Sequence, residues 1–185
     1  MNYLKSPEKE LLDLEEKKNK IHLDMQKADL IKERLIRDFS TSSNSNILSY
    51  SDFLILVIRM DGILDYISEF FNNLNYIQFN SLNIGFKKKY YRLIRNTLEM
   101  AEILKETIRL IKNNPKAIIA DINRMHRIRD NSKKLIRNCR NFLFNENDLE
   151  KRNLVITLSS INILETLIDK MNHVIEIIRI LRYEN

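Results

Sequence analysis

The chain has 185 residues, 44% of them hydrophobic and 30% charged, so it can bury a core and is not disordered by composition. Its two glycines, two prolines and single cysteine argue against turn-rich β folds, glycine-rich phosphate loops, disulfide frameworks and cysteine-rich metal sites. The formal net charge is +6, and residues 86–140 hold 16 of the 31 basic residues but only 5 of the 25 acidic ones. The composition therefore favours an almost entirely helical protein with a strongly basic middle.

Apolar residues recur with a helical period in five stretches of the chain. Ser6 and Pro7 are a good start for the first helix, because proline at the first helical position needs no N–H partner. Asn114 and Pro115 stop one helix and start the next in the same way. A polar cap over 145–148 is expected to give the last helix an acidic first turn. The predicted helices cover residues 7–39, about 49–73, 86–113, 115–144 and 148–182, with an Asn-rich loop over 72–85.

Long helices joined by short loops predict an all-α, up-and-down bundle that forms one domain over residues 1–185. The longest uninterrupted apolar run, 53–58, is much shorter than the roughly 20 residues of a membrane span, so we expect a cytoplasmic protein without one. A weak internal repeat relates the halves 7–75 and 115–182, with the helix over 86–113 as the link. Its acidic positions carry the comparison: they pair Asp29 with Asp130, Asp61 with Glu165, and Asp65 with Asp169.

Those acidic positions are candidate metal ligands. Residues four apart share a helix face, so Asp61 and Asp65 point the same way, as do Glu165 and Asp169. Carboxylates that project inward from several helices, sometimes with histidine, bind di-iron and similar clusters in helical bundles. The candidate metal ligands are Asp29, Asp61, Asp65, His126, Asp130, Glu165 and Asp169, with His173 as a further member. The alternative is that they are carboxylates at the edge of the core, neutralised by Lys and Arg.

The basic middle offers a second candidate site. It could hold an acidic partner, phospholipid headgroups or phosphate itself, and Lys87, Lys88, Lys89, Arg92 and Arg95 are its predicted surface. A nucleic-acid-associated helical protein would use the same stretch. The plain alternative is a solvated helix face in a Lys-, Asn- and Ile-rich sequence.

Catalysis has little support in the sequence. The chain contains no recognised nucleophile or zinc-hydrolase motif, so we predict a non-enzymatic protein, with a di-metal bundle enzyme as the alternative. Cys139 stands next to Arg140, which could lower its pKa, but a lone helical cysteine more often serves packing. His22 is expected on the exposed side of its helix.

Three segments, DFLILVIRMDGILDYISEFF, IIADINRMHRIRDNSKKLIRNCRNFLF and ILETLIDKMNHVIEII, lie on the second, fourth and fifth predicted helices. In the first and third an acidic residue precedes Asp by four positions, and in the second His126 precedes Asp130 by four. The three segments resemble PhoU-like phosphate transport regulators, also called Pit accessory proteins. The chain departs from the family pattern at His126, where a glutamate is expected, and at Met25, where an acidic residue is expected. Because thioether sulfur suits soft ions, Met25 is excluded as a ligand of a hard metal.

The resemblance implies a regulatory or accessory role in phosphate uptake or phosphate signalling. It implies that Asp61, Asp65, Asp130, Glu165 and Asp169 bind metal ions, with iron, zinc or another divalent ion as the candidates. The implied partner is a membrane phosphate transporter or a signalling protein, contacted from the cytoplasmic side of the membrane. An apolar-rich last helix, with Ile175, Ile177, Ile178, Ile180 and Leu181, also suggests a homo-oligomer.

Overall fold

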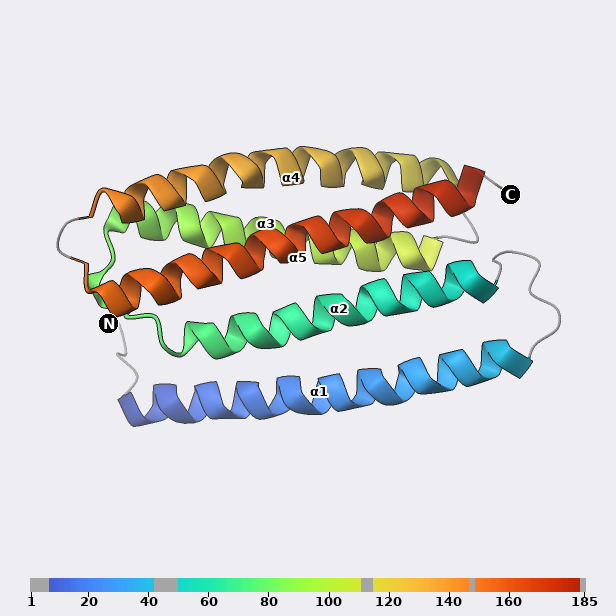
Figure 1. Cartoon of the computed structure of the whole chain (residues 1–185), viewed down its shortest axis with the longest axis horizontal. Coiled ribbons are helices and arrows are strands. Elements are labelled where there is room, and N and C mark those ends of the chain that lie inside the picture. The colour runs from blue at the N-terminus through green and yellow to red at the C-terminus, as the bar shows by residue number, and fades with distance from the viewer. Residues whose placement is uncertain (1–6, 42–49, 111–114, 147–148, 184–185) are drawn as a thin grey trace, which may run out of the picture. The chain divides into compact units, whose positions relative to one another are not determined.

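The computed structural model describes residues 7–41, 50–110, 115–146 and 149–183, and within these ranges it contains helices and no strand (Figure 1). The all-α fold predicted from the sequence is therefore confirmed. Along the described ranges, five α-helices and one 3-10 turn follow one another: α1 Pro7–Thr41, α2 Tyr50–Leu74, η1 Phe79–Ser81, α3 Ile84–Leu110, α4 Pro115–Phe144 and α5 Lys151–Tyr183.

The predicted helix bounds differ from the observed ones by at most three residues, and both bounds of α4 are correct. Both α1 and α4 begin at the predicted prolines, Pro7 and Pro115. The last helix begins at Lys151, three residues later than predicted, and its first turn holds no acidic residue. The prediction of an acidic first turn is wrong because Glu150 is itself the cap: its carbonyl oxygen accepts the N–H of Leu154 at 2.9 Å.

The chain divides into two compact units, Met1–Asn44 and Ser45–Asn185. The first contributes α1, along which Ile21, Met25 and Ala28 are half-buried. His22 is exposed, as predicted, and lies 3.2 Å from the amide nitrogen of Gln26. The second unit holds α2 to α5. The single domain over 1–185, with repeat halves 7–75 and 115–182, stays a prediction.

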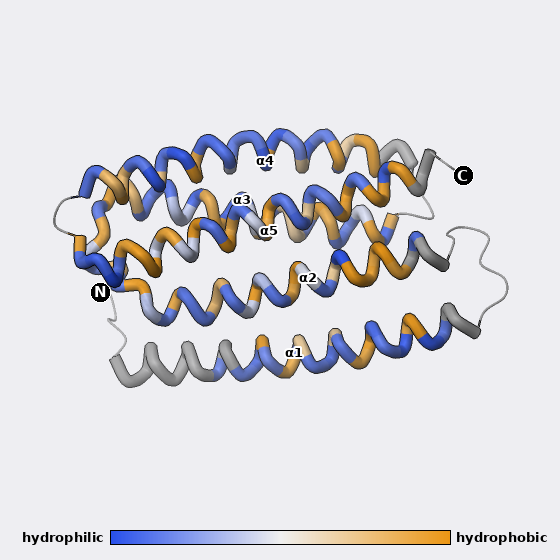
Figure 2. The backbone as a smooth tube through the Cα atoms, viewed as in Figure 1, coloured by the Kyte–Doolittle hydropathy of each residue, from blue (hydrophilic) through white to orange (hydrophobic). Residues whose placement is uncertain are grey.

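In the second unit, α5 packs against all three of the other helices, and α3 and α4 pack against each other. Figure 1 shows α5 between α4 and α2. In Figure 2, α4 is hydrophilic along most of its length, whereas hydrophobic residues recur all along α5. A helix that is apolar around most of its circumference has to be buried, which accounts for the central place of α5. Its fully buried side chains include Ile161, Leu164, Ile168, Met171 and Ile175.

This packing bears on the predicted self-association face of the last helix. Ile175 and Ile178 are completely buried in the core of this chain, so neither is available to a second copy. Ile177 is half-buried and Ile180 is exposed, while Leu181 lies outside the side chains that the structure describes. No helix among the described residues is both long and apolar enough to cross a membrane.

Candidate functional site

The carboxylates of α5 that face α4 are matched by basic side chains of that helix. Glu165 accepts a hydrogen bond from Arg140 at 2.5 Å, and Asp169 accepts one from the Nε–H of Arg129 at 3.0 Å. Lys133 lies 3.9 Å from the same oxygen of Asp169. Each of these groups is about one-third exposed, so the ion pairs lie along the edge of the seam between α4 and α5.

About two helical turns beyond Asp169, the same seam contains a pair formed by a histidine of α4 and a glutamate of α5. The Nε2 atom of His126 on α4 lies 2.5 Å from Glu176 of α5, whose other oxygen lies 2.9 Å from Arg179. The predicted metal ligands His126, Glu165 and Asp169 therefore do lie along one seam, but each faces an oppositely charged or hydrogen-bonding side chain rather than the other two. This is the neutralised arrangement that the sequence left open as the alternative.

The other predicted metal ligands lie apart from this seam. Asp130 is exposed and has no partner among the described residues. Asp65 is also exposed, Asp61 is half-buried, and both lie on α2. Asp29, in the first unit, lies 3.1 Å from Lys32, and His173 is exposed on α5. In the part of the chain that the structure describes, no three His, Cys, Asp or Glu side chains come together as a metal-binding group.

Within the seam, one buried polar atom has no partner. The side-chain oxygen of Asn172, a residue only 6% exposed on α5, makes no hydrogen bond to any described residue. A buried acceptor left without a donor costs about 1–3 kcal/mol. Asn172 follows Asp169 by three residues and therefore lies on the same face of α5. Its side-chain oxygen is thus an acceptor in the seam without a donor among the described residues.

A second polar cluster lies inside the helix bundle, where α3, α4 and α5 meet. The Tyr90 hydroxyl is hydrogen-bonded to the Ser160 hydroxyl, and Cys139 is fully buried, as predicted for a packing cysteine. Burial raises the pKa of Tyr90 to about 12 and that of the Cys139 thiol to about 11. A buried thiol that stays protonated is a poor nucleophile, so Cys139 does not suggest catalysis.

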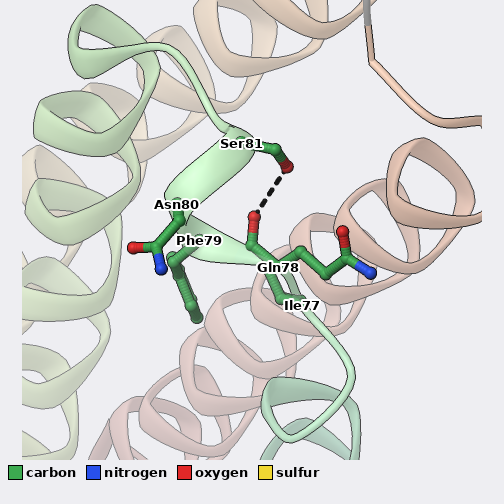
Figure 3. A pocket seen from close by; sticks show the side chains of 5 residues that line it. All are labelled: Ile77, Gln78, Phe79, Asn80 and Ser81. Atoms are coloured by element: carbon green, nitrogen blue, oxygen red, sulfur yellow. Dashed lines mark hydrogen bonds between the residues drawn. The ribbon is translucent and has the colours of Figure 1, made fainter.

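One side chain of α5 makes three hydrogen bonds to the connection between α2 and α3, whose Ile77 and Leu82 are buried in the core. Asn153, 2% exposed, accepts the backbone N–H of Gln78 at 3.0 Å and donates to the Gln78 carbonyl at 3.2 Å and to the Ser81 hydroxyl at 2.8 Å. The connection borders a hollow of about 500 Å³ lined by residues 77–81. Figure 3 shows the Ser81 hydroxyl turned onto the Gln78 carbonyl, at 2.9 Å, with the Gln78 and Asn80 side chains pointing apart. Because its polar groups are already used internally or diverge, the hollow has no convergent set of ligand contacts.

The predicted basic surface lies on the first half of α3. Lys88, Arg92 and Arg95 are exposed, and Lys87 and Lys89 are half-buried, with the Lys89 ammonium 5.7 Å from the centre of the Phe142 ring on α4. The sequence did not single out Lys134 and Arg137, which are exposed on the neighbouring α4. We call the five exposed residues Lys88, Arg92, Arg95, Lys134 and Arg137 the basic face. None of them has an ion-pair partner within the described residues.

Some basic residues of the middle segment form ion pairs, whereas the basic face, together with exposed Arg127 and Lys105, forms none among the described residues. Arg129, Lys133 and Arg140 neutralise carboxylates of α5, and Arg124 binds Glu99 of α3 at 2.6 Å. Unpaired cations on neighbouring helices can bind an anionic surface, whereas the paired ones mainly hold helices together.

In comparisons with known proteins, no family model matches the chain and no curated protein matches it significantly.

Proposed function

We propose that this protein is a non-enzymatic accessory protein that binds an anionic partner through its basic face. The observation that carries the proposal is the group of five exposed basic side chains on α3 and α4 without ion-pair partners among the described residues. Such a concentration of one sign of charge raises the local concentration of an anionic partner and speeds its association.

The first half of α3 supports this proposal through its charge pattern. Five basic residues and no acidic residue occur over 86–98, whereas over 99–110 three glutamates accompany two basic residues. In that second half Arg109 binds Glu106 at 2.8 Å, so its charges cancel locally. A helix that only needed solubility would not require the two signs to be separated along its length.

The predicted tie to phosphate uptake or phosphate signalling, through a membrane phosphate transporter or a signalling protein, rests on the family resemblance. Binding of iron, zinc or another divalent ion by Asp61, Asp65, Asp130, Glu165 and Asp169 rests on it as well. The basic face does not depend on the phosphate-uptake prediction or on the metal-binding prediction. It is compatible with an anionic surface on a membrane phosphate transporter or on a signalling protein. We therefore make the basic face the basis of the proposed function, and metal binding stays a prediction.

Two charge-reversal variants test the proposal. The first is the triple variant Lys88→Glu, Arg92→Glu and Arg95→Glu, on the basic face. The matched control is the triple variant Lys20→Glu, Arg59→Glu and Lys105→Glu, which alters three exposed basic residues elsewhere and lowers the formal net charge by the same amount. Far-ultraviolet circular dichroism verifies that both variants are folded.

We expect the wild-type protein and the control variant to be retained on immobilised heparin, a polyanion, and to elute only as salt rises. The basic-face variant should elute at the lowest salt concentration, because binding to a polyanion weakens with each lost cationic contact. Equal elution of the two variants would mean that net charge, and not this face, determines binding. That result would overturn the proposal.

A further inference from the structure

Four of the five most exposed large apolar side chains described in the second unit lie at one end of the helices. The five, each at least 60% exposed, are Tyr76 60%, Ile84 70%, Leu98 61%, Phe144 66% and Val155 65%. Leu98 lies in the middle of α3. The other four come from four separate segments: the connection after α2, the first residue of α3, the last of α4 and the first turns of α5.

Contacts between these segments place the four residues at the same end. A Cβ atom on Gly85, next to Ile84, would lie 3.2 Å from the Phe142 ring, two residues before Phe144. Asn153, two residues before Val155, binds Gln78, two residues after Tyr76. Figure 1 shows the starts of α3 and α5 and the ends of α2 and α4 on the same side of the view. We call Tyr76, Ile84, Phe144 and Val155 the apolar end.

Basic residues outnumber acidic ones near the apolar end, where Glu146 is half-buried and Glu150 is exposed. Lys88, Lys151 and Arg152 are exposed and Lys87 is half-buried, and none has an ion-pair partner among the residues that the structure describes. Residues 76–92 and 141–155 together contain six basic and three acidic residues. Because Lys88 also belongs to the basic face, the charged surface continues from the sides of α3 and α4 to this end.

We infer that the apolar end docks on an anionic phospholipid bilayer, and that the lipid headgroups are the anionic partner of the basic face. The inference rests on the proposed function and names its partner. Lysine and arginine side chains would bind the lipid phosphates, while Ile84, Phe144 and Val155 enter the boundary between headgroups and acyl chains. Tyr76 has an apolar ring and a polar hydroxyl, a combination suited to that boundary.

The combination favours a bilayer over a protein or a nucleic acid. Single apolar side chains from four segments do not need shape complementarity to enter a bilayer, whereas a protein interface requires a closely packed apolar centre. A phosphate backbone offers no apolar environment for Ile84 or Phe144. The end therefore has the two features that interfacial binding uses together, apolar side chains and unpaired cations.

The experiment uses the full chain and vesicles of phosphatidylglycerol and phosphatidylcholine in equal amounts, with pure phosphatidylcholine vesicles for comparison. The test variant is Ile84→Ser with Phe144→Ser. The control is Leu98→Ser, which alters an equally exposed apolar residue away from the apolar end. Thermal melts verify that the variants fold, and co-sedimentation measures the fraction bound.

We expect binding to the anionic vesicles, binding at least tenfold weaker to pure phosphatidylcholine, and a loss of about tenfold in the Ile84→Ser/Phe144→Ser variant. The Leu98→Ser variant should bind within twofold of the wild type. If the double variant also binds within twofold, the apolar end does not dock and the inference fails, while the proposed function stands. If the protein binds RNA or DNA but not these vesicles, the partner is a nucleic acid and the inference fails. If it binds no polyanion at all, the proposed function fails as well.

Discussion

The side-chain amide of Asn153 pairs with the backbone of Gln78 in the way that one strand residue pairs with another. Its oxygen accepts the Gln78 N–H at 3.0 Å and its nitrogen donates to the Gln78 carbonyl at 3.2 Å. The first turn of α5 is thereby attached to the segment that joins α2 to α3. Most N–H groups of this connection bond to carbonyls within it, whereas the Gln78 N–H depends on Asn153 as its acceptor.

Replacement of Asn153 should therefore destabilise the protein. Asn153→Ala leaves the Gln78 N–H without its acceptor, whereas the Gln78 carbonyl keeps the Ser81 N–H and hydroxyl as donors. The substitution should lower the free energy of unfolding by about 1–3 kcal/mol. Urea denaturation followed by circular dichroism measures the change. The control is Asn162→Ala on the same helix, because Asn162 is exposed and accepts one hydrogen bond from Arg140 at 2.8 Å. Similar losses in both variants would show that Asn153 does not hold the connection.

The seam between α4 and α5 predicts that its carboxylates act through ion pairs. Asp169→Asn removes the charge that faces Arg129 and should lower the free energy of unfolding by about 1 kcal/mol, less at high salt. A chelator should leave the melting temperature of the wild type unchanged. Asp130→Asn, at an exposed position on α4, is the control and should have almost no effect.

The metal-site prediction gives the opposite result for the same samples. If Asp169 holds a divalent ion, the chelator should lower the melting temperature of the wild type but not that of Asp169→Asn. Elemental analysis of protein purified without added metal would then find a stoichiometric ion. Either of these two results would refute the ion-pair account of the seam.

The buried Tyr90 and Cys139 predict a loss of stability at high pH. The pKa of the Cys139 thiol rises from 9.0 to about 11 on folding and that of Tyr90 from 10.0 to about 12, mainly because burial disfavours the ionised forms. Above pH 9 the unfolded chain releases these protons before the native protein does. Their contribution is therefore complete below pH 9 and falls as pH rises towards 11 and 12, by up to about 1.4 kcal/mol per pH unit for each group.

Urea denaturation at pH 8, 9.5 and 10.5 measures this loss. We expect the decline to be shallower in Cys139→Ala than in the wild type, because the variant lacks one of the two buried acids. Identical pH profiles in the two proteins would contradict the prediction. The comparison of slopes removes the effect of groups that titrate equally in both.

The two glycines should respond to alanine in opposite ways. At Gly62 in α2, an added Cβ would lie 3.0 Å from the ammonium of Lys170, the end of a flexible side chain that can move. Gly62→Ala should then raise the free energy of unfolding by up to about 1 kcal/mol, because alanine favours a helix interior. At Gly85 the neighbours are Asn83 and the Phe142 ring, at 3.1 and 3.2 Å, so Gly85→Ala should be destabilising. Thermal and urea denaturation distinguish the two, and equal signs would contradict the packing at Gly85.

The carboxylates of α5 show what residue spacing in the sequence can predict and what it cannot. The i and i+4 positions of Glu165 and Asp169 predict correctly that the two side chains share one face of the helix. Spacing says nothing about the side chain on the facing helix, and the structure places Arg140 and Arg129 there. The choice between metal ligand and ion pair depends on how α4 is rotated about its axis, which no local pattern encodes.

The sequence by itself determined that this protein is helical and where the proline-marked helices start, because helical period and capping are properties of neighbouring residues. Only the tertiary structure decided that Cys139 is fully buried, which basic residues of the middle segment are neutralised, and which form no ion pair among the described residues. It also brought four exposed apolar residues from separate segments to one end. Both depend on contacts between residues far apart in the chain, where packing and charge pairing override local preference.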